Sequence, residues 1–301
     1  MKISGHLIVL CGPTGVGKTK LAVDLAKSLD CEIISADSRQ IYKEMYIGTA
    51  VPGKTELNSV VHHFIQSHSI HNYYNASMFE AEVNSFLNNY FTQNERIIMV
   101  GGSGLYIDAV CKGIDDLPTI PHDIRRKWLE LFKNKGLKFL QDQVKKCDPE
   151  YYNKVDRNNP KRLLKAIEVF EITGKPYSTF LKKESKPRSY STLKIGLNIK
   201  RDILYERINH RVDQMIKVGL IEEARALYPH QKLTPLNTVG YKELFSYFDG
   251  KIPLEEAIEQ IKNHSRAYAR KQITWFRRDP EIIWFEPEDF EMIRNYIYEK
   301  I

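Results

Sequence analysis

The segment HLIVLCGPTGVGKTKLAVDLAKSL, residues 6–29, decides the fold class of this 301-residue chain. Its first residues, 6–11, are apolar enough for a buried strand, and Leu21, Leu25 and Leu29 recur at helical spacing. Between the two elements stands a match to the pattern GxxxxGK[ST], namely Gly12-Pro13-Thr14-Gly15-Val16-Gly17-Lys18-Thr19. A strand, a glycine-rich loop and a helix in this order predict an α/β protein with a phosphate-binding loop, the P-loop.

The residue types of this loop suit a diphosphate-like ligand. Its glycines let successive backbone N–H groups turn toward a phosphate, and the following helix directs its positive end to the same place. Lys18 adds a mobile positive charge, and Thr19 offers a hydroxyl ligand for Mg²⁺. ATP is the commonest such ligand, but the loop by itself requires only the diphosphate group.

Further apolar runs predict the rest of a parallel sheet. Residues 31–36 (CEIISA) and 96–100 (RIIMV) read as strands, and residues 193–199 (LKIGLNI) are expected to rejoin the sheet. Helical spacing continues over residues 201–227 and 254–276. Because ligands of parallel α/β sheets lie beyond the carboxyl ends of the strands, the site is expected at that edge.

Two polar features follow the predicted strands directly. Asp37 comes after the second strand, and its position alone suits a carboxylate associated with Mg²⁺, a helix cap or a catalytic base. A second glycine turn, Gly101-Gly102-Ser103-Gly104, follows the third strand.

The chain changes character after Gly113. The proline-marked connection DDLPTIPHD leads into charged helical segments without convincing strands. We therefore expect a P-loop core domain made of residues 1–113 and 194–301, and an inserted helical domain made of residues 114–193.

The positive charge is concentrated in parts of the chain. The net charge is +7, yet residues 151–201 hold 13 Lys or Arg against 4 Asp or Glu, a local excess of +9. Residues 262–278 add six Lys or Arg and no acid. Two such runs with aromatic residues among them favour a nucleic-acid partner.

Cysteine usage and hydropathy bear on location. The four cysteines show no CxxC spacing, and the apolar stretch before Gly12 is too short for a secretory signal or a membrane span. We expect reduced thiols, a cytoplasmic location, no membrane association and a monomer.

Five motifs in order resemble those of the tRNA dimethylallyltransferase family, the bacterial tRNA isopentenyltransferases. They are the P-loop, ADSRQIYK at residues 36–43, GGSGLY at 101–106, PKRL at 160–163 and QITWFRR at 272–278. The resemblance covers nearly the whole chain. It implies transfer of a dimethylallyl group from dimethylallyl diphosphate to N6 of the adenosine immediately 3′ of the anticodon in tRNA, with release of diphosphate.

The resemblance also implies roles for residues. The P-loop, with Lys18 and Arg211, would hold the leaving diphosphate, Thr19 would bind Mg²⁺, and Asp37 would be the general base or would orient N6. Thr14 would help to orient Asp37 or the substrate. The residues implied to contact tRNA, in its anticodon stem-loop, are Asp37, Ser38, Arg39, Gln40, Ser103, Arg126, Lys161, Arg162, Leu163, Leu164, Lys165, Lys271, Gln272, Trp275, Arg277 and Arg278.

Three other functions share parts of this pattern. An ATP-dependent small-molecule kinase would use the P-loop and Asp37, but it has no need of the basic segment. An adenylate prenyltransferase differs only in its acceptor, which is free AMP. A P-loop module that binds RNA without chemistry would not need Asp37.

Overall fold

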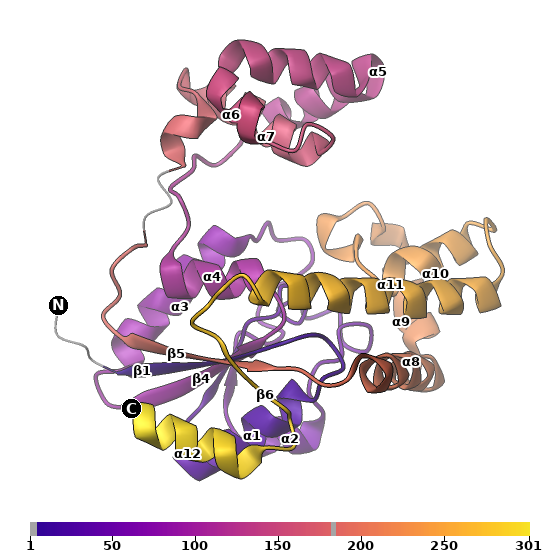
Figure 1. The fold of residues 1–301 in the computed structure, drawn as a ribbon. Coiled ribbons are helices and arrows are strands. Elements are labelled where there is room, and N and C mark those ends of the chain that lie inside the picture. The colour runs from indigo at the N-terminus through magenta and orange to yellow at the C-terminus, as the bar shows by residue number, and fades with distance from the viewer. Residues whose placement is uncertain (1–4, 182–184) are drawn as a thin grey trace. The chain divides into compact units, whose positions relative to one another are not determined.

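A six-stranded parallel sheet is the centre of the larger part of the molecule. The computed structural model describes residues 5–181 and 185–301 (Figure 1). The strand order is β3-β2-β4-β1-β5-β6. The strands are β1 (His6–Cys11), β2 (Ile33–Ser35), β3 (His62–His63), β4 (Arg96–Gly101), β5 (Ser191–Leu197) and β6 (Ile283–Phe285).

The predicted α/β fold class is confirmed, and the order of the strands explains where the P-loop lies. β1 pairs with β4 on one side and with β5 on the other, so that Cys11 stands between Gly101 and Gly196. Strands β3 and β6 were not predicted, because two or three residues are too few to carry a periodic pattern.

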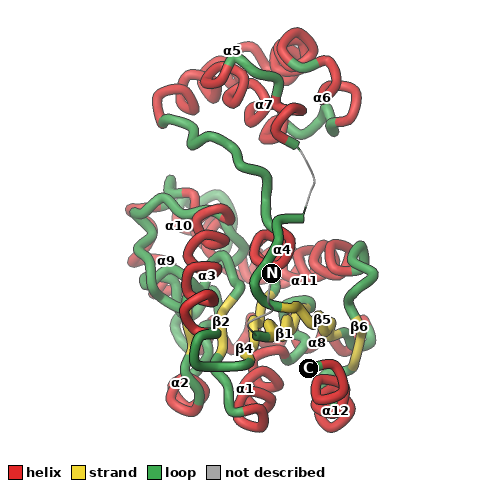
Figure 2. Tube along the Cα trace, turned by 90° about the vertical axis from the view of Figure 1, so that its left-hand side faces the viewer, coloured by secondary structure: helices red, strands yellow, loops and turns green. Residues whose placement is uncertain are grey.

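Helices cover both faces of this sheet. Figures 1 and 2 show α1 and α12 on one face and α4 and α11 on the other. The helices are α1 (Lys18–Leu29), α2 (Lys54–Ser59), α3 (Ala76–Tyr90), α4 (Gly104–Lys112), α8 (Arg201–Lys217), α9 (Leu220–Leu227), α10 (Tyr241–Phe248), α11 (Leu254–Phe276) and α12 (Phe290–Lys300), with the short 3₁₀ helices η2 (Tyr228–His230) and η3 (Thr234–Leu236).

Residues 201–227, expected to be helical throughout, form two helices. The chain leaves α8 after Lys217, and Gly219 is the N-cap of α9 with a φ of 109°. The helix expected over residues 254–276 is present as α11 with those limits.

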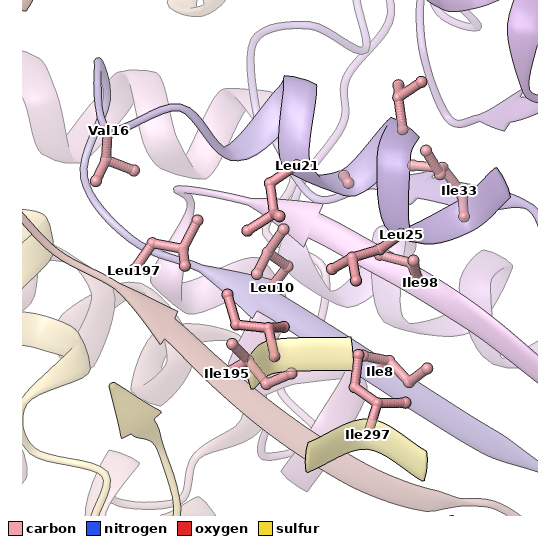
Figure 3. Packing of buried hydrophobic residues seen from close by; sticks show 14 of the residues in the cluster. Ile8, Leu10, Val16, Leu21, Leu25, Ile33, Ile98, Ile195, Leu197 and Ile297 are labelled. Carbon is pink, nitrogen blue, oxygen red and sulfur yellow. The ribbon is translucent and has the colours of Figure 1, made fainter. Parts of the chain in front are cut away.

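The core of the sheet joins the strands to α1 and α12. Ile8, Leu10 and Ile195 are fully buried and pack with Leu25 of α1 and Ile297 of α12 (Figure 3). Central strands of a parallel sheet are apolar on both faces because helices cover each of them. The continuous apolar run of residues 6–11 follows from this burial.

The second compact unit, Lys112–Lys186, is helical in its described residues. Its helices are α5 (His122–Cys147), α6 (Pro149–Lys154), α7 (Pro160–Thr173) and the 3₁₀ helix η1 (Tyr177–Phe180). It has its own core, in which Leu140 and Val144 of α5 pack with Leu163 and Ile167 of α7.

This unit ends earlier than the expected limit of 193. Residues from Pro187 onward belong to the larger unit. Tyr190 is buried there, and its hydroxyl oxygen lies within hydrogen-bond distance of Asn84 Oδ1, at 2.7 Å, and of the Val110 carbonyl oxygen, at 3.0 Å. β5 follows at once and pairs with β1, so the return to the sheet is complete before residue 193.

The division into units also divides the charge. The sequence from Lys112 to Lys186 holds 18 Lys or Arg against 11 Asp or Glu, an excess of seven. This excess equals the net charge of the chain, +7, so the larger unit is neutral. No helix among the described residues is long and apolar enough to span a membrane.

Leu10→Ala tests the core of the sheet. Leu10 is fully buried, and its truncation is expected to lower the free energy of unfolding by about 2–5 kcal/mol, since a cavity is left in a packed interior. Met292→Ala, at a position that is 62% exposed, is the control and should change it by less than about 0.5 kcal/mol. Urea denaturation followed by circular dichroism measures both, and equal effects would contradict this assignment of the core.

Candidate functional site

The P-loop runs from the end of β1 to the first turn of α1, at the carboxyl edge of the sheet. Gly12 has a φ of 151°, and a Cβ atom there would lie 2.6 Å from the carbonyl oxygen of Leu197 in β5. Gly17 is the N-cap of α1. The loop therefore needs glycine at Gly12 for its close approach to β5, and it presents the N-terminus of α1 to a ligand.

Lys18 is held by the loop itself. Its Nζ atom donates to the carbonyl oxygens of Gly12 at 3.0 Å and Pro13 at 2.7 Å. Burial, together with the neighbouring cation of Arg211, lowers the pKa of Lys18 to about 8, while the carboxylate of Asp37 opposes this shift. The side chain therefore sits where a bound anion would most favour its charged form.

Arg211 reaches the same loop from α8. Its Nη1 atom donates to Thr14 Oγ1 at 3.4 Å. Burial lowers the pKa of this guanidinium, and the negative charge of Asp37 acts in the opposite direction. The hydroxyl of Thr14 thus has Arg211 as its partner, whereas the family resemblance implies that Thr14 orients Asp37 or the substrate.

Asp37 lies just after β2 and closes a turn. Its Oδ1 atom accepts hydrogen bonds from the backbone N–H groups of Arg39 at 2.8 Å and Gln40 at 3.3 Å. Its charge also acts on Lys18 and Arg211. Asp37 therefore stabilises a turn and does not cap a helix, since no helix begins in the described stretch between β2 and α2, and its charge acts on the P-loop cations.

Ser103 connects the second glycine turn to the turn that follows Asp37. Its Oγ atom accepts a hydrogen bond from the N–H of Ser38 at 2.9 Å and donates to Ser38 Oγ at 3.2 Å. Ser103 is buried, so these bonds hold the start of α4 against the Asp37 turn.

Gln272 joins the two glycine loops. Its Oε1 atom accepts from the N–H of Thr14 at 2.8 Å, and its Nε2 atom donates to the carbonyl of Gly102 at 2.8 Å. A Cβ atom at Gly102 would lie 2.2 Å from that nitrogen. Gln272, which was expected to contact tRNA, is buried, and its amide positions the P-loop.

Tyr268, one turn earlier on α11, was not found from the sequence. Its hydroxyl interacts with Ser103 and Gln272. Burial raises the pKa of this phenol to about 12, and the negative charge of Asp37 adds to the shift. A lone tyrosine in a helix carries no motif, so only its position on the same face as Gln272 could have indicated it.

The last turn of α11 is exposed beside α4. Trp275 is 37% exposed, and its Nε1 atom donates to Asp108 Oδ2 at 2.8 Å. The guanidinium of Arg278 lies 5.9 Å from the centre of the indole ring. Lys271, Arg277 and Arg278 are exposed, so this end of the helix presents an aromatic side chain among cations.

In the smaller unit, the PKRL motif of residues 160–163 forms the first turn of α7, which Asn159 caps. Leu163 and Leu164 are buried in the core of this unit, so their side chains are not available to a partner. Lys161 and Arg162 are exposed, as is Arg126 on α5. Lys165 is half-buried, and burial lowers its pKa.

The residues present fit a magnesium ion that is held mainly by its substrate. Thr19 is half-buried in the first turn of α1, and its hydroxyl makes no hydrogen bond within residues 5–181 and 185–301. No group of three or more His, Cys, Asp or Glu in that part of the chain could hold a metal ion. Mg²⁺ commonly takes few protein ligands and completes its shell with phosphate oxygens and water.

Comparisons with known proteins agree with this arrangement. A family model described as IPP transferase matches residues 40–279. The chain is 49% identical over 295 residues to the tRNA dimethylallyltransferase 2 of Parabacteroides distasonis, covering 98% of this chain and 99% of that protein. It is 50% identical over 300 residues to the tRNA dimethylallyltransferase of Christiangramia forsetii, covering 99% of each. These two alignments therefore cover nearly all of the chain.

Solved structures are similar over nearly the whole chain. The full-length tRNA isopentenylpyrophosphate transferase of Bacillus halodurans has a TM-score of 0.73 and 36% identity, covering 98% of this chain and 96% of that one. A eukaryotic dimethylallyltransferase acting on tRNA has a TM-score of 0.80 and 27% identity, covering 95% of this chain and 75% of that one. The chain therefore belongs to the IPP transferase family, that of the tRNA dimethylallyltransferases.

Proposed function

We propose that this protein transfers a dimethylallyl group from dimethylallyl diphosphate to N6 of the adenosine immediately 3′ of the anticodon in tRNA, releasing diphosphate. The observation that carries the proposal is the convergence of Lys18, Arg211 and Asp37 at the P-loop of a chain of this family. Two cations suit a diphosphate leaving group, and a carboxylate beside them suits a proton acceptor.

The other functions are not favoured. Relatives about half identical to this chain over nearly its full length are named as tRNA dimethylallyltransferases, not as kinases or AMP prenyltransferases. The excess charge of the smaller unit suits a polyanionic acceptor, for which a small-molecule kinase or an AMP-specific enzyme has no need.

Departure of the diphosphate is the step that the P-loop assists. The allylic C–O bond breaks, its electron pair passes to the diphosphate oxygen, and negative charge grows there. Lys18, Arg211 and the N–H groups at the start of α1 would stabilise that charge. Mg²⁺, held by Thr19, would neutralise the same oxygens. These residues come from one chain, so the proposal needs no second copy.

Attack by the adenine is the step that Asp37 assists. The exocyclic nitrogen N6 is a weak nucleophile because its lone pair is delocalised into the ring. A new N–C bond forms to the allylic carbon, and Asp37 would accept the proton that N6 loses. Ser103, through Ser38, and the N–H groups of Arg39 and Gln40 would hold Asp37 in place.

The exposed cations and Trp275 would hold the RNA. An anticodon-loop base is stacked, so the enzyme must extrude it and bind the strand around it. We propose that the RNA is bound on the larger unit by Trp275, Arg277 and Arg278. On the smaller unit we propose that it is bound by Arg126, Lys161, Arg162 and Lys165. Leu163, Leu164 and Gln272 would contribute through their packing and hydrogen bonds.

Asp37→Asn separates the turn-stabilising role of Asp37 from the chemical one. An asparagine can still accept the hydrogen bonds from Arg39 and Gln40 through Oδ1, but it cannot accept the N6 proton. If Asp37 is the base, Asp37→Asn and Asp37→Ala should both lower turnover by about 10²–10⁴-fold. Nucleoside mass spectrometry of tRNA incubated with dimethylallyl diphosphate and Mg²⁺ measures the product.

Two other outcomes identify the remaining alternatives for Asp37. Near-normal turnover of Asp37→Asn with a slow Asp37→Ala would mean that Asp37 only stabilises the turn. Recovery of Asp37→Asn at high Mg²⁺ would point to a carboxylate associated with the metal.

The pKa of Lys18 predicts how kcat/KM falls on the alkaline side of the pH profile. Because its pKa is lowered to about 8, the ammonium loses its proton, and so its charge, as the pH rises through that value. The kcat/KM for dimethylallyl diphosphate, which reports on the free enzyme, should therefore fall above about pH 8. Lys18→Arg keeps a charge at all these pH values, so its lower kcat/KM should lack this limb. The same limb in Lys18→Arg would exclude Lys18 as its source.

Salt dependence tests the RNA surface of the smaller unit. Replacing Lys161 and Arg162 by Gln should weaken tRNA binding and reduce the slope of log Kd against log[KCl] by about 1 to 2, since each phosphate contact releases counterions. The control is Lys175→Gln, an exposed cation that follows the other end of α7. If the double variant has the slope of the wild type, Lys161 and Arg162 do not contact the RNA.

A further inference from the structure

Three arginines gather around one tyrosine on the surface formed by α8 and α11. Arg201 Nε and Arg270 Nη1 both donate to the hydroxyl oxygen of Tyr205, each at 2.9 Å. The guanidinium carbon of Arg201 lies 5.1 Å from the centre of the Tyr205 ring, and that of Arg266 lies 5.9 Å from it. We name these four residues the Tyr205 cluster.

Neutral oxygen atoms hold these guanidiniums in place. Arg266 donates from Nη1 to Asn209 Oδ1 and from Nη2 to Asn263 Oδ1, each at 2.5 Å. Asn209 lies on α8 and Asn263 on α11, and the two helices pack together over buried Leu204 and Ala269. The charged groups are therefore oriented before any ligand arrives, which reduces the entropy lost on binding.

The charge of the Tyr205 cluster is not balanced locally. In the part of the chain that the structure describes, none of its three guanidiniums forms an ion pair with a carboxylate. Other cations on the same helices do form ion pairs. Lys262 Nζ lies 2.8 Å from Asp213 Oδ1, and Arg207 Nη2 lies 2.9 Å from Glu288 Oε1. The hydrogen bond from Arg270 also lowers the pKa of the Tyr205 phenol, as expected where positive charge accumulates.

The cluster is separate from the diphosphate site. Arg207 and Arg211 of α8 reach the P-loop. Arg201, Tyr205 and Asn209 follow one another at i, i+4 and i+8 and so form a different stripe of the same helix. Their partners are on α11, not on the loop. A second anion would therefore bind here without displacing the first.

The spacing of arginines along α11 indicates which kind of anion the cluster binds. Arg266, Arg270 and Arg277 are spaced i, i+4 and i+11 and share one face of the helix. About 10 Å of helix separates Arg270 from Arg277, at the end that we propose contacts RNA. A line of arginines of this kind suits successive phosphates of one strand, because a guanidinium can bind two phosphate oxygens at once.

We propose that the Tyr205 cluster binds a backbone phosphate of the tRNA substrate, beyond the contacts made by the last turn of α11. The inference rests on the proposed function, since it names a further contact for the same acceptor. Phosphate contacts of this kind fix the position and orientation of a nucleic acid and do not read its sequence. The cluster would therefore help to align the anticodon stem-loop with Asp37 in any tRNA substrate.

The test compares two double variants that lose the same charge. Arg201→Gln with Arg270→Gln removes two cations of the cluster. Lys27→Gln with Lys300→Gln, on α1 and α12, removes two exposed cations on the opposite face of the sheet from α11 (Figure 1). Fluorescence anisotropy of labelled tRNA from about 50 to 200 mM KCl gives Kd and its salt slope for each.

The cluster variant should bind tRNA about tenfold more weakly at the lowest salt, with a slope reduced by about 1. The α1 and α12 variant should stay close to the wild type. Arg270→Gln alone should show the same change to a smaller degree, and it remains a usable test if the double variant unfolds. A cluster variant with the Kd and slope of the wild type would overturn the proposal.

Two further measurements separate the possible causes. Binding of inorganic diphosphate, measured by calorimetry, should be the same in the cluster variant and the wild type. A loss of diphosphate binding with unchanged tRNA binding would show that the cluster serves the free anion and would overturn the proposal. Failure of the wild type to prenylate tRNA would contradict the proposed function itself, whereas a prenylating wild type with an insensitive cluster contradicts this inference alone.

Discussion

The parallel pairing of β1 with β4 and β5 determines where every element of the site lies. This pairing sets Cys11 level with Gly101 and Gly196, so the P-loop and the second glycine turn leave the sheet side by side. The chain must turn sharply at both points while β5 passes close by. A side chain at Gly12 would meet the backbone of β5, and one at Gly102 would meet Gln272. The glycines are therefore required by the crowding at this edge, whatever the ligand of the loop.

Gln272 of α11 links this edge of the sheet to the helix by hydrogen bonds. One amide satisfies an N–H of the P-loop and a carbonyl of the second glycine turn. The bond to Gly102 is buried and the bond from Thr14 is partly buried, and an unpaired polar group in such a place is costly. Tyr268 and Trp275 lie on the same helix and are thereby set beside Asp37 and α4. The helix proposed to contact RNA is thus also the helix that shapes the P-loop.

Charge is distributed in two different ways. The smaller unit carries the whole net charge of the chain, whereas the larger unit is neutral. Within the neutral unit, several carboxylates neutralise particular cations, as Asp213 does for Lys262 and Glu288 does for Arg207. The P-loop pair of Lys18 and Arg211 and the Tyr205 cluster are exceptions. Anion sites in such a unit depend on which cations lack carboxylate partners, and net charge cannot show that.

Much of the fold was accessible from the sequence because its signals are local. The P-loop, the strands that became β1, β2, β4 and β5, the helix α11 and the helical nature of the insert each follow from patterns within a few tens of residues. Strands β3 and β6 could not be predicted, since they are set by pairing with neighbours and not by their own pattern.

The sequence by itself determined the family, the P-loop and the presence of Asp37 after a strand. Only the tertiary structure decided which side chains meet there. Thr14 and Gln272 are 258 residues apart in the chain and are joined because α11 packs across the carboxyl edge of the sheet. The same packing buries Gln272 and brings Arg270 to Tyr205. Such contacts depend on how a helix lies on a sheet, which no local spacing of residues specifies.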